Sequence, residues 1–229
     1  MRILIGIVSL ILLSSIIVVA KQPDNVPPDI RKVTFVHYIK SSVTKPTWDD
    51  TEDDFKLISG GVKWSHTISY EVNPAGSGLA PGVVKSALEA SSETWDVETG
   101  FELFAPPSIT ANTSVGYDGK NRVVWEALDP GVIAVTHLWY DPATKEIVEF
   151  DTVFNINYNW GILDPENPDT TKMDLQNIAT HEFGHNGLGD LRPPKDWALT
   201  MYAYSDLGET HKRTLGTGDI LGIQTLYGE

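Results

Sequence analysis

The chain contains no cysteine in its 229 residues. It therefore has no disulfide, no thiol nucleophile, no Cys-based zinc knuckle and no cysteine through which an inhibitory segment could bind a metal. Basic residues are also few, because 17 Lys and Arg stand against 31 Asp and Glu, which gives a net charge of −14. This balance argues against binding to nucleic acid and against docking on anionic lipid. Without disulfides, the folded part depends on its hydrophobic core, or on core and metal together.

Long apolar runs are absent except at the N-terminus, where residues 3–20 follow Arg2. A basic start, an apolar stretch and a small residue at Ala20 predict that residues 1–20 are a signal peptide or a single N-terminal membrane anchor. Either alternative predicts a secreted, extracellular or cell-surface protein. Residues 21–57 are rich in Pro, Asp and Thr and are predicted to be an extended linker or pro-like segment. The remaining residues, 58–229, are predicted to form one folded domain.

The most informative stretch is ATHEFGHNGLGD at residues 179–190, which contains an HExxH motif. His181 and His185 are four residues apart, so on a helix both imidazoles can point at one metal ion. Glu182 lies one step round the helix, where its carboxylate can hold a metal-bound water and take its proton. Zinc binds N and O ligands of this kind and keeps one position open for water. The motif predicts zinc binding by both histidines and general-base catalysis by Glu182.

A site of this type needs a third protein ligand, and Asp190 is the nearest candidate after the motif. Gly187 and Gly189 would allow the helix to end and the chain to turn back under the metal. In the alternative interpretation, Asp190 caps a turn. More distant candidates for the third ligand are Asp196, Asp206 and Glu209. The other histidines, which are not expected to bind the catalytic metal, are His37, His66, His137 and His211.

Hydrophobic periodicity predicts the order of the secondary-structure elements. The expected elements are strands over residues 66–72, 101–104 and 122–125, helices over 81–99 and 174–186, and a hairpin of 132–140 with 146–154. A short β-like run over residues 33–38 interrupts the N-terminal segment. This order predicts an α+β fold in which two or three helices pack on a mixed, twisted β-sheet.

Residues 179–190 resemble the metzincin signature HExxHxxGxx(H/D), and most closely that of matrixin-like metalloproteases of the kind found in archaea. Leu199-Thr200-Met201-Tyr202 resembles the Met-turn of that family, and residues 219–228 resemble its final helix. Residues 149–151, Glu-Phe-Asp, resemble the strand ahead of the site. The resemblance spans residues 56–228 and implies that residues 58–229 are a metzincin-like catalytic domain. It also implies a zincin-like fold, with an active-site helix ending at a Gly turn and a small C-terminal lobe.

The spacing after the second histidine departs from the family pattern. Gly187 and Asp190 each come one residue early, and Leu188 and Leu191 stand at the family positions. Two outcomes follow from this deletion. Either the helix ends a residue sooner and Asp190 reaches the metal, or Asp190 is misdirected and the site is weakened.

The resemblance implies a secreted or membrane-anchored zinc endopeptidase with one catalytic Zn²⁺, acting on a polypeptide bound in extended form. One alternative is a catalytically inactive zinc-binding or surface interaction module. Another is a different zinc hydrolase whose third ligand is a distant Glu. Structural Ca²⁺ is a further expectation, since oxygen ligands suit this cation, although the same acidic residues could lie in a solvated loop. The residues concerned are Asp151, Asp164, Glu166 and Asp169.

Overall fold

The structure is a computed structural model that describes residues 26–40, 50–193 and 196–229. The predicted signal peptide or anchor, residues 1–20, lies outside these ranges. Within them, no helix has both the length and the apolar character needed to cross a membrane.

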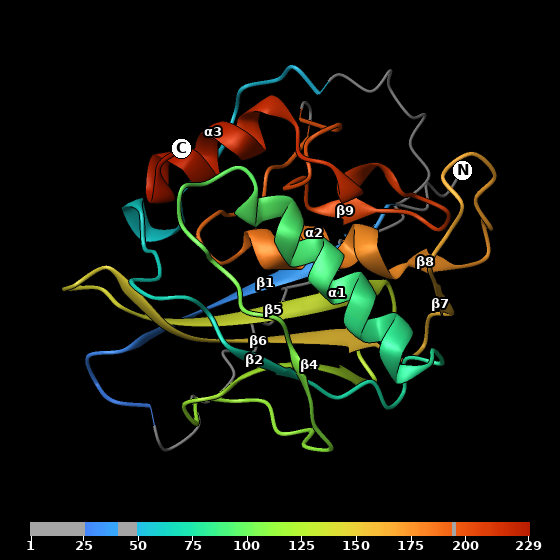
Figure 1. Cartoon of the computed structure of the whole chain (residues 1–229), viewed down its shortest axis with the longest axis horizontal. Coiled ribbons are helices and arrows are strands. Elements are labelled where there is room, and N and C mark those ends of the chain that lie inside the picture. The colour runs from blue at the N-terminus through green and yellow to red at the C-terminus, as the bar shows by residue number, and fades with distance from the viewer. Residues whose placement is uncertain (1–25, 41–49, 194–195) are drawn as a thin grey trace, which may run out of the picture.

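A seven-stranded mixed sheet, with the strand order β3-β2-β4-β6-β5-β1-β9, forms the centre of the described part (Figure 1). Its strands are β1 (Arg31–Ile39), β2 (Tyr70–Val72), β3 (Ser108–Ile109), β4 (Asn121–Glu126), β5 (Val132–Asp141), β6 (Glu146–Asn155) and β9 (Tyr204–Ser205). Strands β7 (Trp160–Gly161) and β8 (Met173–Asp174) form a separate parallel pair. The α-helices of the described residues are α1 (Pro81–Asp96), α2 (Leu175–Gly184) and α3 (Thr217–Tyr227). Two 3₁₀ turns, η1 (Ile58–Gly60) and η2 (His211–Arg213), complete the elements.

Strand directions confirm the mixed sheet of the predicted α+β fold. β5 runs antiparallel to both β6 and β1, as expected for a hairpin strand with a further strand beside it. β4 runs parallel to β6 and to β2, and β9 runs parallel to β1. The predicted hairpin is confirmed, because residues 141–146 connect β5 and β6 in register.

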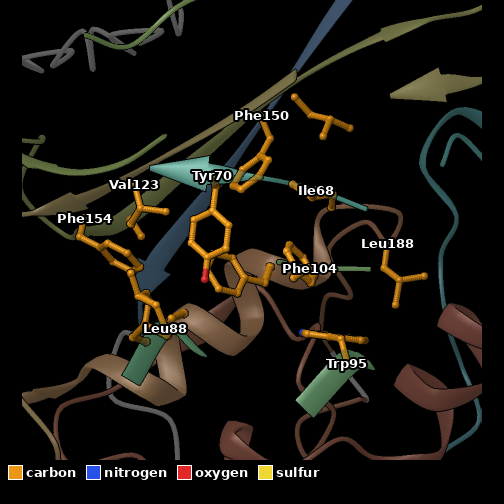
Figure 2. Close-up of a cluster of buried hydrophobic side chains, with 14 of the residues drawn as sticks. Ile68, Tyr70, Leu88, Trp95, Phe104, Val123, Phe150, Phe154 and Leu188 are labelled. Carbon is orange, nitrogen blue, oxygen red and sulfur yellow. The ribbon is translucent and has the colours of Figure 1, made fainter. Parts of the chain in front are cut away.

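Helices α1 and α2 pack against each other over one face of the sheet (Figure 1). The buried face of α1 carries Leu88 and Trp95, and the indole N–H of Trp95 donates to the Thr180 carbonyl of α2 at 2.8 Å. Figure 2 shows Tyr70 and Phe150 from the sheet converging on the same cluster. The chain after α2, with β9 and α3, lies on the side of α2 away from β2 and β4, consistent with a small C-terminal lobe (Figure 1).

Two predicted strands are wrong in extent or in kind. Residues 66–72 form a strand only over Tyr70–Val72, and residues 101–104 contribute a single bridge between Phe104 and Ile68. The reason lies in Asp96, whose carboxylate accepts the backbone N–H groups of Leu103 and Phe104 at 2.7 and 3.1 Å. These donors are therefore not available for a longer strand ladder. The predicted helices over residues 81–99 and 174–186 are shorter in the structure, ending at Asp96 and Gly184.

Candidate active site

Helix α2 carries the HExxH motif and is fixed at its N-terminus by Asp174. The Asp174 side chain accepts the backbone N–H of Asn177 at 2.7 Å, as an N-cap does, and also binds the guanidinium of Arg213. Because Arg213 belongs to η2, this contact joins the helix start to the C-terminal lobe. The helix is buried along nearly its whole length, so the motif side chains project into a closed protein environment.

The two motif histidines point their Nε2 atoms at the carboxylate of Asp190. The Asp190 Oδ1 atom lies 3.5 Å from His181 Nε2 and 3.6 Å from His185 Nε2. The opposite ring nitrogens face backbone carbonyls, with His181 Nδ1 at 2.7 Å from Thr200 O and His185 Nδ1 at 2.9 Å from Leu188 O. These contacts assign the ring proton to Nδ1 in each histidine. The structure thus brings together the three residues predicted as metal ligands.

This donor set fits a metal ion. With Nδ1 protonated, each Nε2 is a hydrogen-bond acceptor, and it faces another acceptor in the Asp190 carboxylate. His181 Nε2 and Asp190 Oδ1 are both buried without a hydrogen-bond partner, which is costly unless a cation lies between them. Zinc ligands about 2.0–2.2 Å from the metal stand about 3.4 Å apart at the edges of a tetrahedron. The observed separations of 3.5 and 3.6 Å match that geometry.

The end of α2 accommodates the short spacing before Asp190. The helix stops at Gly184, and the Leu188 N–H donates to the Gly184 carbonyl at 2.9 Å. Gly187 lies against α3, where a Cβ atom would approach Leu226 to 2.4 Å. A side chain at this position would therefore require Leu226 to move. In the structure, Asp190 faces both histidines rather than pointing away from them.

Glu182 is fully buried beside this cluster, and both of its carboxylate oxygens are bonded. Thr136 of β5 donates its hydroxyl to Oε2 at 2.7 Å, and His37 of β1 lies 3.0 Å from Oε1. Burial raises the pKa of the Glu182 carboxyl to about 8, and the Thr136 hydrogen bond opposes this rise. A carboxyl whose pKa lies near neutrality is suited to accepting a proton and returning it. His37, His181 and Glu182 also form a close group, but the two bonds to Glu182 oppose its use as a ligand.

The predicted Met-turn lies directly under α2. Thr200 supplies the carbonyl that faces His181, and Asp219 of α3 holds the turn by accepting the N–H groups of Thr200 and Met201 at 2.7 and 3.0 Å. Helix and turn touch at Gly184, where a Cβ atom would lie 2.2 Å from Met201 Sδ. Asp219 thus positions the carbonyl that orients a histidine. Sequence reasoning assigned Asp219 to a helix and missed this role.

Strand β1 crosses the site. The ring of Phe35 stacks on His185, with ring centroids 3.9 Å apart, and the ring of His37 lies 4.0 Å from that of His181. Its backbone pairs with β5 over most of its length and with β9 at Tyr38 and Ile39. The sequence predicted a β-like run here but gave no sign of its partner. In the sheet, β1 occupies the side of β5 that faces away from β6.

The other predicted positions lie elsewhere or serve other contacts. Asp206 caps its own loop through Leu207, and Glu209 binds Lys40. The calcium candidate Asp151 is buried and accepts backbone N–H groups of Gly116 and Arg122 at 2.7 and 3.0 Å. The other calcium candidates lie in an exposed loop, and the metal-ligand groups of the described residues include none of these carboxylates. Those candidates are Asp164, Glu166 and Asp169.

The chain was compared with protein-family models and with known proteins. Residues 63–228 match the matrixin family model. The chain is 26% identical to macrophage metalloelastase of Oryctolagus cuniculus over 76% of this chain and 35% of that protein. It is 27% identical to stromelysin-1 of Mus musculus over 76% of this chain and 35% of that protein. It is 26% identical to metalloendoproteinase 2-MMP of Arabidopsis thaliana over 76% of this chain and 45% of that protein.

The chain therefore spans less than half of the length of these relatives. They are mammalian and plant proteins, so they do not confirm the narrower resemblance to archaeal members. The family match covers most of the chain and includes α2, the Met-turn and α3. The chain belongs to the matrixin family.

Proposed function

We propose that this protein is a zinc-dependent endopeptidase that hydrolyses peptide bonds in an extended polypeptide. Membership of the matrixin family supports a zinc metalloendopeptidase at the family level and implies zinc and structural calcium as cofactors. The observation that carries the proposal is the convergence of two buried imidazole acceptors on a buried carboxylate oxygen, with Glu182 beside them. His181, His185 and Asp190 are the proposed metal ligands.

Glu182 is the proposed general base. Zinc held by the three ligands would supply Lewis acidity, polarising the scissile carbonyl and making water acidic near neutral pH. Glu182 accepts the proton of the attacking water and passes it to the departing amine. Thr136 orients the carboxylate through its bond to Oε2, which leaves Oε1 directed toward β1 and the site of a substrate. Thr200 and Leu188 hold the two imidazoles in the tautomer that presents Nε2.

The test is Glu182→Gln in the chain from residue 21 to residue 229. Casein cleavage should fall by at least about 1,000-fold, because the amide cannot accept the proton, while zinc content by plasma emission stays near one per chain. Glu89→Gln is a matched control, since Glu89 pairs with Lys85 on the exposed part of α1. Retained cleavage in Glu182→Gln would exclude this role. Zinc binding without cleavage in any variant would favour the inactive module instead.

We further propose that the N-terminal segment is pro-like, with β1 as the part that blocks the cleft. Support comes from its contacts: β1 covers one pairing side of β5, Phe35 stacks on His185, and His37 is bonded to the Oε1 atom of Glu182. A substrate paired along β5 would compete for the same backbone groups. Cleavage should therefore need β1 to leave.

Phe35→Ala combined with His37→Ala tests this latency in the full chain. Both side chains face α2, so their loss should weaken β1 and raise casein cleavage, or remove a lag before it. Arg31→Ala is the control, because this exposed residue of the same strand donates to carbonyls of its own segment, Pro28 and Ile30. Equal activity of the double variant and the control would count against an inhibitory β1. So would full activity of the wild-type protein while mass spectrometry shows residues 26–40 still attached.

Export of the protein, as a secreted or anchored enzyme, is proposed from residues 1–20 alone. Expression of the whole chain with N-terminal sequencing of the product tests it. A mature N-terminus at Lys21 would support a cleaved signal peptide, whereas an intact leader in the membrane fraction would support an anchor. Intact, soluble protein retained in the cytoplasm would rule out both.

A further inference from the structure

The buried side chain of His37 occupies a polar pocket formed by Glu182, Ser205 and Lys212. It is 1% exposed, and its Nε2 atom lies 3.0 Å from Ser205 Oγ and 3.4 Å from Lys212 Nζ. Lys212 is itself fully buried, and its Nζ donates to the Tyr202 carbonyl. Two donors, a hydroxyl and an amine, therefore lie at the Nε2 atom of His37.

Strand β1 lies between β5 and β9 as a bound peptide would. It is antiparallel to β5 on one side and parallel to β9 on the other. Near the pocket it bonds to both walls, since Tyr38 N donates to Ala203 O at 3.3 Å and Ile39 N donates to Gly131 O at 2.9 Å. A polypeptide that replaced β1 could form the same bonds in the same direction. The side chain in the position of His37 would then enter the same pocket.

The contacts of β1 also indicate where a peptide would be cut. Phe35 stacks on His185, and His37 lies against His181 and Glu182, so the two rings flank the metal-ligand group. The carbonyls of Phe35 and Val36 both lie between these two residues, and that of Val36 is joined directly to His37, the residue bonded to Glu182. His37 is next to Glu182, the group that would return a proton to the departing amine. The pocket therefore receives the side chain of the first residue after the scissile bond.

The chemistry of the pocket discriminates between side chains. An aliphatic group would leave the Ser205 hydroxyl and Lys212 without the acceptor that His37 Nε2 now provides, and burying donors without acceptors is unfavourable. Burial lowers the pKa of Lys212 to about 7, which is the direction expected for a cation held away from water. The Gln Oε1 atom lies the same number of bonds from Cα as the Nε2 atom of His, so Gln can reach the same donors.

We propose that Lys212 and Ser205 are specificity-determining residues, which select a substrate with an acceptor-tipped side chain, Gln or His, immediately after the scissile bond. This inference rests on the proposed endopeptidase activity. Most of the polar surroundings come from the C-terminal lobe, since Ser205 lies on β9 and Lys212 on η2. The Lys212 backbone is fixed to α2, because its N–H donates to Asn177 Oδ1 at 2.8 Å. The amine is therefore held at a defined depth.

The experiment compares peptides that differ only at this residue. Peptides with Gln, His, Leu or Met are cleaved by the Phe35→Ala/His37→Ala protein, in which β1 is weakened, and kcat/KM is measured for each. The Gln peptide should be favoured over the Leu peptide by about tenfold or more, as expected for one or two buried hydrogen bonds. Lys212→Met should bring this ratio near one. Lys85→Met is the control, because it makes the same change on the exposed part of α1.

A binding measurement separates this inference from the proposed activity. Adding Glu182→Gln to the same protein removes turnover, and fluorescence polarisation then compares the affinities of labelled Gln and Leu peptides. The same tenfold preference is expected, and it should be lost in Lys212→Met and reduced in Ser205→Ala. Equal affinities, or a preference that survives Lys212→Met, would overturn the assignment. A preference in binding without any cleavage by the active form would support the pocket and refute the endopeptidase.

Discussion

Asp190→Ala is the substitution that tests the metal centre most directly. In the structure, Asp190 Oδ1 lies 3.5 and 3.6 Å from the two Nε2 atoms, close to the roughly 3.4 Å between tetrahedral zinc ligands. Loss of a residue that only supports a ligand costs about 10–100-fold in metal affinity. Removal of a direct ligand should exceed this, so zinc affinity is expected to fall by at least about 100-fold.

The same geometry predicts the opposite effect on the metal-free protein. Without a cation, the Asp190 carboxylate faces two imidazole acceptors, and its Oδ1 is buried without a hydrogen-bond partner. Asp190→Ala removes this unfavourable contact. The metal-free variant is therefore expected to be as stable as the wild type, or more stable, although its zinc-dependent stabilisation is lost.

Competition with a chromophoric chelator measures the affinity, and urea denaturation with and without chelator measures the stability. Asp206→Ala is a suitable control, because that carboxylate binds its own loop through the Leu207 N–H at 2.9 Å. Unchanged zinc affinity in Asp190→Ala would refute the ligand assignment. Loss of affinity in Glu209→Ala instead would favour the layout with a distant Glu ligand.

Four further substitutions test the surroundings of the site by urea denaturation. Gly184→Ala places a Cβ 2.2 Å from a sulfur and should cost about 1–3 kcal/mol, whereas no loss would mean that the Met-turn moves freely. Leu88→Ala should cost about 2–5 kcal/mol, and a smaller effect would contradict the tight core. Asp219→Asn turns an amide donor toward backbone donors and should cost about 1–3 kcal/mol; a neutral result would remove its role in holding the turn. Burial lowers the pKa of His137 to about 4, below its usual 6.5, so the folded state binds fewer protons. The stability that this lowered pKa contributes to the folded state is complete above pH 6.5. It is lost as the pH falls toward 4, by up to about 1.4 kcal/mol per pH unit. His137→Gln should therefore reduce the loss of stability between pH 7 and pH 5. Parallel pH profiles of the unfolding free energy for the variant and the wild type would refute this.

Local features of the sequence predicted the parts of the site that are close together in the chain. The spacing of His181 and His185 suffices to place both rings on one helix face, and the glycines that follow lie where the chain turns after α2. The hairpin of β5 and β6 was also predictable, because alternating apolar residues flank a short turn rich in polar residues. The strand expected over residues 101–104 is reduced to a single bridge, because Asp96 at the end of α1 accepts the backbone N–H groups of Leu103 and Phe104.

The contacts that complete the site join residues far apart in sequence, and no local pattern reveals them. His37 was an isolated histidine in a segment rich in Pro, and its bond to Glu182 spans 145 positions. Lys212 was one of 17 basic residues, and nothing in its neighbours indicated burial. Such pairings depend on the order of strands in the sheet, which is a property of the whole chain.

Strand β9, which carries Ser205, lies at the end of the sheet and, among the described residues, pairs only with the chain that lies beside β5. In the described part of the chain, β1 is the one strand that connects β9 to β5. Departure of β1 would leave β9 without a ladder partner, and the segment carrying Ser205 and Lys212 would lose part of its anchorage. An incoming peptide would rebuild that ladder as it binds. The peptide residues that pair with β9 would then help to hold Ser205 and Lys212 in position. Short peptides that end at the pocket should then be discriminated less sharply than longer ones.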